Sequence, residues 1–156
     1  MSADNEWLSP EYWQDRQFDW KHKIFYFVDM PCLLGTPRNL FDSSQQLKAE
    51  IATKEHRVTD DAMVLIQPGT LKGKLMINVH KPDDYDAYVF ELEPSKLFST
   101  VHEGPLKTIK KTAKELQEKV KKEKGVPVTN TFYWDFRHGP QMAGQRADRF
   151  VVICQV

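Results

Sequence analysis

The sequence is poor in cysteine and carries no excess of charge. Only Cys32 and Cys154 occur among 156 residues. They are far apart and outside any CxxC spacing, so neither a disulfide framework nor a paired-cysteine site is indicated. The 22 basic and 22 acidic side chains cancel to a net charge of zero. Because a nucleic-acid-binding protein needs a surplus of lysine and arginine on one face, this balance argues against direct nucleic acid binding.

Long hydrophobic runs and common catalytic motifs are also missing. No window approaches the ~18 consecutive apolar residues of a membrane span, and the acidic N-terminus lacks the basic start and apolar run of a signal peptide. We therefore expect a cytoplasmic protein without membrane contact. No P-loop, GxGxxG or GxSxG motif is present, and the five histidines show no ligand spacing. We expect no cofactor and no metal site.

Aromatic residues, in contrast, are abundant. Four Trp, five Tyr and nine Phe make up 12% of the chain. The length fits a single domain over residues 1–156. Residues 1–22 form an aromatic arm that contains Trp7, Trp13, Phe18 and Trp20. Its Ser9-Pro10 step predicts a capped helix start, and its rings either pack on the core as a lid or close over a ligand.

An internal repeat is the most informative pattern. Residues 27–31 (FVDMP) align with residues 90–94 (FELEP) at an offset of 63. After each match come a helical segment, with apolar residues three and four positions apart, and two strands. The helical stripes are Leu40, Ser44, Leu47 and Ile51 in the first half and Leu106, Ile109, Ala113, Leu116 and Val120 in the second. Residues 23–80 and 86–156 thus each predict a strand–helix–strand–strand unit. The fold class expected from the duplication is α+β, with an antiparallel sheet, helices packed on one face and a cleft between the halves.

The second unit contains a short motif where its strand meets its helix. His102, Glu103, Gly104 and Pro105 run directly into the amphipathic segment, and we expect His102 to position this junction. The motif resembles the HxGP junction of GyrI-like small-molecule-binding domains. Residues 23–156 resemble that family's duplicated layout, which also occurs in bacterial transcription effector-binding domains and, more distantly, in SOUL haem-binding proteins. The resemblance implies a pocket between the halves, lined by aromatic rings and one or two carboxylates, for flat lipophilic and often cationic molecules.

Strand alternation then assigns candidate residues to the pocket. Many members of the family carry a Glu whose carboxylate faces the ligand, and Asp135 is the acid in the corresponding strand here. If Phe132, Trp134 and Phe136 lie beneath the helices, Tyr133 and Asp135 face the concave side. Met63 and Leu65 are their equivalents in the first half. The predicted ligand-binding residues are Tyr133, Trp134, Asp135, Met63, Leu65 and Trp20. Alternatively, Asp135 pairs with Arg137 or Arg149 at the surface.

Three functions remain open at this point. The leading hypothesis is a stand-alone binding protein for lipophilic, aromatic or cationic small molecules, serving sensing, sequestration or detoxification. A second is a hydrolase of electrophilic aromatic natural products, which certain relatives resemble, with Asp135 or Glu103 handling the proton. A third is an interaction module whose exposed rings dock a partner protein. The sequence names neither the ligand nor the oligomeric state.

Overall fold

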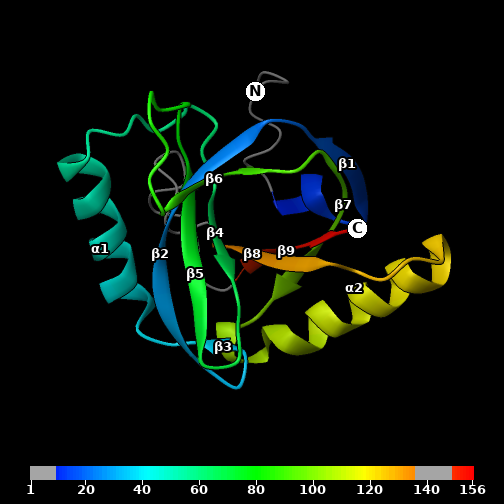
Figure 1. Cartoon of the computed structure of the whole chain (residues 1–156). Coiled ribbons are helices and arrows are strands. Elements are labelled where there is room, and N and C mark those ends of the chain that lie inside the picture. The colour runs from blue at the N-terminus through cyan, green and yellow to red at the C-terminus, as the bar shows by residue number, and fades with distance from the viewer. Residues whose placement is uncertain (1–9, 136–148) are drawn as a thin grey trace.

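The computed structural model describes residues 10–135 and 149–156, with only the backbone at Asp135, and these residues form one nine-stranded antiparallel sheet and two α-helices (Figure 1). Before the middle of the chain come η2 (Pro10–Trp13, a 3₁₀ turn), β1 (Arg16–Trp20), β2 (Lys23–Leu33), β3 (Thr36–Pro37), α1 (Leu40–Thr53), β4 (Val64–Gln67) and β5 (Lys72–Asn78). Then follow β6 (Val89–Leu92), β7 (Ser95–Glu103), η3 (Leu106–Thr108, a 3₁₀ turn), α2 (Ile109–Lys124), β8 (Asn130–Asp135) and β9 (Arg149–Gln155).

The predicted duplication is confirmed. The units β2–α1–β4–β5 and β7–α2–β8–β9 each have the order strand–helix–strand–strand. The strands lie in the order β1-β7-β9-β8-β4-β5-β2-β3, and β6 also pairs with β2, at residues Lys23–Tyr26. The two units meet where β4 pairs with β8, in a register that places Leu65 opposite Trp134. The result is the α+β fold expected from the sequence.

Each unit exchanges a short leading strand with the other. β1 precedes β2 in the chain but pairs with β7, and β6 precedes β7 but pairs with β2 (Figure 1). The alignment of residues 27–31 with residues 90–94 is therefore wrong, because it matches part of β2 with β6 and the turn after it. The strand equivalent to β2 is β7. The arm likewise differs from expectation, since a 3₁₀ turn and the strand β1 stand where a helix start was predicted. Ser9 lies outside the described residues.

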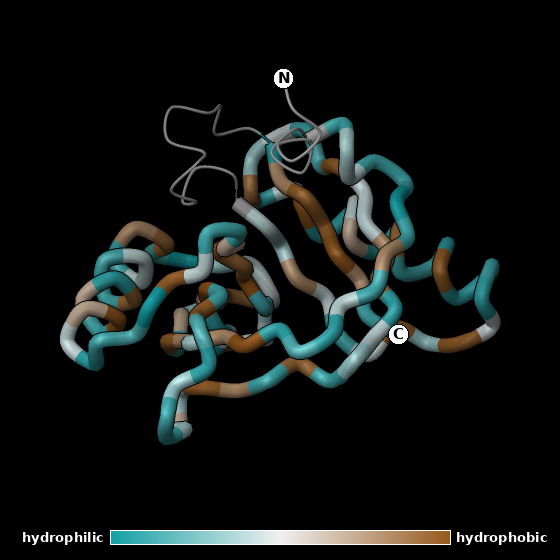
Figure 2. The backbone as a smooth tube through the Cα atoms, turned by 90° about the horizontal axis from the view of Figure 1, so that it is seen from above, coloured by the Kyte–Doolittle hydropathy of each residue, from teal (hydrophilic) through white to brown (hydrophobic). Residues whose placement is uncertain are grey.

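Both helices cover the same face of the sheet, as predicted. The buried stripe of α1 contains Leu47 and Ile51, and that of α2 contains Ile109, Ala113 and Leu116. Each stripe recurs at three- and four-residue spacing, so one side of each helix meets the sheet and the other meets solvent. In Figure 2 the most hydrophobic residues lie along the inner strands, whereas α2 consists mostly of hydrophilic residues.

The strand–helix junction at Gly104 has a clear physical basis. Gly104 has a φ of 127°, a backbone conformation that residues with a Cβ rarely adopt. The His102 ring bridges the turn, with Nδ1 at 2.7 Å from Thr112 Oγ1 and Nε2 at 3.1 Å from the Pro105 carbonyl oxygen. Because a carbonyl oxygen only accepts, Nε2 donates to the Pro105 carbonyl, and in a neutral ring Nδ1 then accepts from Thr112. His102 thus positions the junction, as expected.

The predicted orientation of β8 is wrong. Tyr133 packs in the core cluster that contains the buried residues of both helices. Phe132 and Trp134 lie in a second cluster, on the opposite face of the sheet. Both faces of β8 are apolar and buried, so alternation separated its residues into two sets but did not indicate which set lies under the helices. Phe136 lies outside the described residues.

Candidate functional site

The sheet face away from the helices carries a continuous set of aromatic rings. We call this set the aromatic face; it comprises Trp13, Phe18, Trp20, Phe25, Phe27, Phe90 and Trp134. Neighbouring ring centroids lie 5.1–6.2 Å apart along the whole series, within the range of favourable aromatic pairs. The rings come from the N-terminal arm and from both structural units, so three separate parts of the chain converge here.

Four of the six predicted ligand-binding residues gather on this face. Trp20, Met63, Leu65 and Trp134 belong to one buried cluster, together with Phe25. Trp13 and Trp20 of the arm are buried against the sheet, so this part of the arm packs on the core as a lid. Whether the four residues contact a ligand stays a prediction. Trp7 lies outside the described residues.

One cation lies over rings of the aromatic face, and a second lies over a ring beside it. Phe27 and Phe90 are only partly buried, and the Lys74 ammonium lies 4.5 Å from the Phe27 ring centroid and 5.8 Å from that of Phe90. Beside Trp13, the Arg16 guanidinium lies 3.8 Å from the ring centroid of Tyr12. The electron-rich ring faces are therefore presented in a geometry that attracts positive charge. Sequence reasoning missed Phe27, Phe90 and Lys74, because only the exchange of β6 onto β2 brings the two phenylalanines together.

The two predicted acids lie at the same end of the sheet. Glu103 ends β7 opposite Arg149, and Asp135 ends β8 opposite Phe150, so their strands flank the start of β9. Glu103 Oε1 lies 3.7 Å from Arg149 Nη2, and Glu11 Oε1 lies 3.1 Å from Arg149 Nη1. The Glu103 side chain is largely exposed, so its carboxylate is accessible from solvent. The Asp135 side chain lies outside the described part of the structure.

Tyr133 is separated from the other predicted residues by the sheet itself. Its side chain is 3% exposed on the helix-covered side, and its hydroxyl makes no hydrogen bond within the described part of the chain. Burial raises the pKa of the Tyr133 phenol to about 12, and the neighbouring thiols of Cys154 and Cys32 add to the rise. Burial likewise raises the pKa of the Cys154 thiol to about 11. Tyr133 therefore belongs to a separate environment.

We expect the protein to lose stability at alkaline pH because unfolding allows Tyr133 to ionise. Its folded-state pKa of about 12 lies above the ordinary value of 10.0. This contribution is fully present below pH 10 and is lost as the pH rises through 12. Tyr133→Phe should retain about 2 kcal/mol more of its neutral-pH stability than the wild type at pH 12.

Urea denaturation between pH 8 and pH 12 measures this difference. The control is Tyr85→Phe, which changes a tyrosine that is exposed at the surface and should follow the wild type. An identical alkaline slope for Tyr133→Phe and wild type would contradict the prediction.

Metal and membrane features are not found in the described part of the chain. Within residues 10–135 and 149–156, no group of three or more His, Cys, Asp or Glu side chains is arranged to hold a metal ion. None of the helices described is long and apolar enough to cross a membrane.

Comparison with known proteins gives a family and a fold. Residues 6–156 match the model of a family described as bacterial hydrolase. No match was found among curated proteins. Among solved structures, the EcmrR C-terminal domain superposes with a TM-score of 0.62 at 13% identity, covering 91% of this chain and 95% of that one.

Two further structures extend the comparison. A putative bacterial transcription regulation protein from Staphylococcus aureus MU50 has a TM-score of 0.52 at 14% identity, covering 92% of this chain and 97% of that one. A hydrolase from Listeria innocua also has a TM-score of 0.52, at 13% identity, covering 97% of this chain and 95% of that one. At these identities the likeness establishes a shared fold. That fold agrees with the architecture implied by the GyrI-like resemblance.

Proposed function

The chain belongs to the bacterial hydrolase family, and from this membership together with the aromatic face we propose that it binds a lipophilic, aromatic or cationic small molecule. The binding surface in this proposal is the aromatic face, with Trp20, Met63, Leu65 and Trp134 as its apolar base. One observation carries the proposal: a cation, the Lys74 ammonium, already lies over the rings of Phe27 and Phe90.

The energetics favour a flat cation over a neutral aliphatic ligand. Each cation–ring contact contributes about 0.5–2 kcal/mol, and more where water is excluded. A ring stacked on Phe27 or Phe90 also removes apolar surface from water, at about 25 cal/mol per Å². A ligand that carries both features can take the place of the Lys74 ammonium and retain the same ring contacts.

A rhodamine-type dye, titrated by fluorescence anisotropy, tests this proposal. Phe90→Leu keeps an apolar side chain but removes one ring face, and should weaken binding about fivefold, which corresponds to about 1 kcal/mol. The matched control is Phe41→Leu, because Phe41 is an exposed phenylalanine of α1 and lies outside the aromatic face. Absence of binding below about millimolar dye, with the protein folded, would remove the proposal.

Hydrolysis of an electrophilic aromatic compound is the second candidate function, favoured by the description of the family. Glu103 and Asp135 are the two candidate acids, and they lie on strands that flank β9. A carboxyl group within reach of the substrate could donate a proton to the leaving atom or accept one from water. If turnover of a strained electrophilic substrate falls in Glu103→Gln or Asp135→Asn while dye binding persists, the protein is a hydrolase. If turnover is absent in the wild type, the protein is a binding protein alone.

A further inference from the structure

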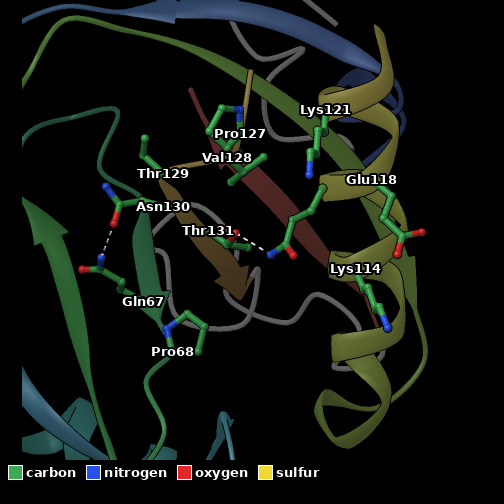
Figure 3. A pocket seen from close by; sticks show the side chains of 11 residues that line it. Gln67, Pro68, Lys114, Glu118, Lys121, Pro127, Val128, Thr129, Asn130 and Thr131 are labelled. Atoms are coloured by element: carbon green, nitrogen blue, oxygen red, sulfur yellow. Dashed lines mark hydrogen bonds between the residues drawn. The ribbon is translucent and has the colours of Figure 1, made fainter. Parts of the chain in front are cut away.

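A groove runs along the other face of the sheet, between α2 and the turn that joins β4 to β5. We call it the helix-side groove; it consists of two chambers of about 550 Å³ and about 520 Å³ that share Pro68 as a lining residue. The larger chamber lies between α2 and the start of β8 (Figure 3). The smaller one is lined by Tyr133, Lys110 and the turn at Leu34. Both volumes are typical of sites for small molecules.

One side of the groove is positively charged. Lys110, Lys114, Gln117 and Lys121 of α2 line it, at spacings of four, three and four residues that place them on one face of the helix. Lys114 and Lys121 make no ion pair with any residue of the described segments. Figure 3 shows the Glu118 carboxylate, the acid among the lining residues, pointing away from the strands. The groove therefore favours an anion.

The floor of the groove supplies one unused hydrogen-bond donor. Gln117 donates a hydrogen bond of 2.8 Å to Thr131, and Gln67 donates one of 2.9 Å to Asn130 (Figure 3). Both side-chain amides are therefore already hydrogen-bonded to β8. Tyr133 differs, because its hydroxyl has no hydrogen-bond partner in the described residues, although Tyr133 lines the smaller chamber. An acceptor atom of a ligand in that chamber could accept this hydrogen bond.

A lysine lines the smaller chamber together with Tyr133. The Lys110 ammonium donates a hydrogen bond of 2.6 Å to the Leu34 carbonyl oxygen, across the turn between β2 and β3. This neutral acceptor holds the ammonium beside the chamber. A carboxylate would be a stronger acceptor for the same group.

We propose that the helix-side groove binds a small aromatic carboxylate, with its carboxylate between the Lys110 ammonium and the Tyr133 hydroxyl. The ring system lies past Pro68 in the larger chamber, against Pro127 and Val128. The carboxylate accepts a hydrogen bond from each group and takes the place of the Leu34 carbonyl. The site is separate from the aromatic face, on the other side of the sheet, and selects the opposite charge.

Titration with 2-naphthoate, followed by the fluorescence of the ligand and by amide chemical shifts, tests this site. We expect saturable binding that weakens as the salt concentration rises, because the attraction depends on exposed lysines. Tyr133→Phe and Lys110→Gln should each weaken binding fivefold or more. The control Lys111→Gln removes the same charge from a position of α2 that does not line the groove, and should leave binding within twofold of wild type.

Three results would overturn the proposal. The first is no saturable binding of 2-naphthoate by the folded protein up to about 10 mM. The second is equal affinity in wild type, Tyr133→Phe and Lys110→Gln. The third is displacement of 2-naphthoate by a rhodamine-type dye whose binding is weakened by Phe90→Leu, because this would place both ligands on the aromatic face. Independent binding of dye and naphthoate supports two sites, whereas loss of dye binding alone affects only the proposed function.

Discussion

Trp134→Ala is expected to lower the free energy of unfolding by about 3–5 kcal/mol. The Trp134 side chain is 0% exposed and lies in β8, between Leu65 of β4 and Val151 of β9. Its ring is 5.7 Å from that of Trp13, so it joins the two structural units to the arm. Truncation would leave a cavity at the seam between the units, where three separate elements would have to shift to fill it.

Urea denaturation at neutral pH measures this effect. Phe41→Ala provides the comparison, because Phe41 is 69% exposed and its removal should change stability by no more than about 0.5 kcal/mol. A loss below about 1 kcal/mol for Trp134→Ala would show that the seam does not depend on this ring.

Gly69→Ala is expected to lower stability by about 2–3 kcal/mol, because an added methyl group overlaps the backbone. A Cβ at this position would lie 2.0 Å from the Lys72 carbonyl oxygen and 3.0 Å from the carbonyl carbon. Both atoms belong to Lys72, the first residue of β5, so the turn between β4 and β5 must open before the side chain fits. The clash is with backbone atoms, which have no alternative rotamer.

Gly125→Ala distinguishes this clash from ordinary glycine strain. Gly125 caps α2 with a φ of 71°, and a Cβ there would meet nothing within 4 Å. That variant should lose only about 1 kcal/mol, from the left-handed conformation. Equal losses in the two glycine variants, measured by chemical denaturation, would mean that the turn accommodates the methyl group.

The helices were the most predictable elements of the fold. The stripe from Leu106 to Val120 recurs at helical spacing, and an amphipathic helix on a sheet must bury that stripe. The strand–helix–strand–strand order was also readable, because each unit repeats it. The exchange of β1 and β6 was not, since pairing between strands so far apart in the chain leaves no local pattern.

The candidate site was predicted in part, and for a physical reason. Met63 and Leu65 lie on the face away from the helices, as expected, whereas Trp134, which was expected beneath the helices, lies on the same face as they do. Tyr133 was placed on the wrong face, because an apolar residue on each side of β8 satisfies either orientation. The helix-side groove was not predictable at all, because its walls come from α2, β8 and two turns that only the fold brings together.

The strand exchange constrains how the molecule could have arisen and how it folds. A single unit, made without the other, would lack a partner for its leading strand, and two identical copies could supply each other only as a swapped homodimer. Fusion of such a pair yields the present connectivity. During synthesis, β1 must wait until β7 has emerged before it can pair, so completion of the sheet is a late and non-local step.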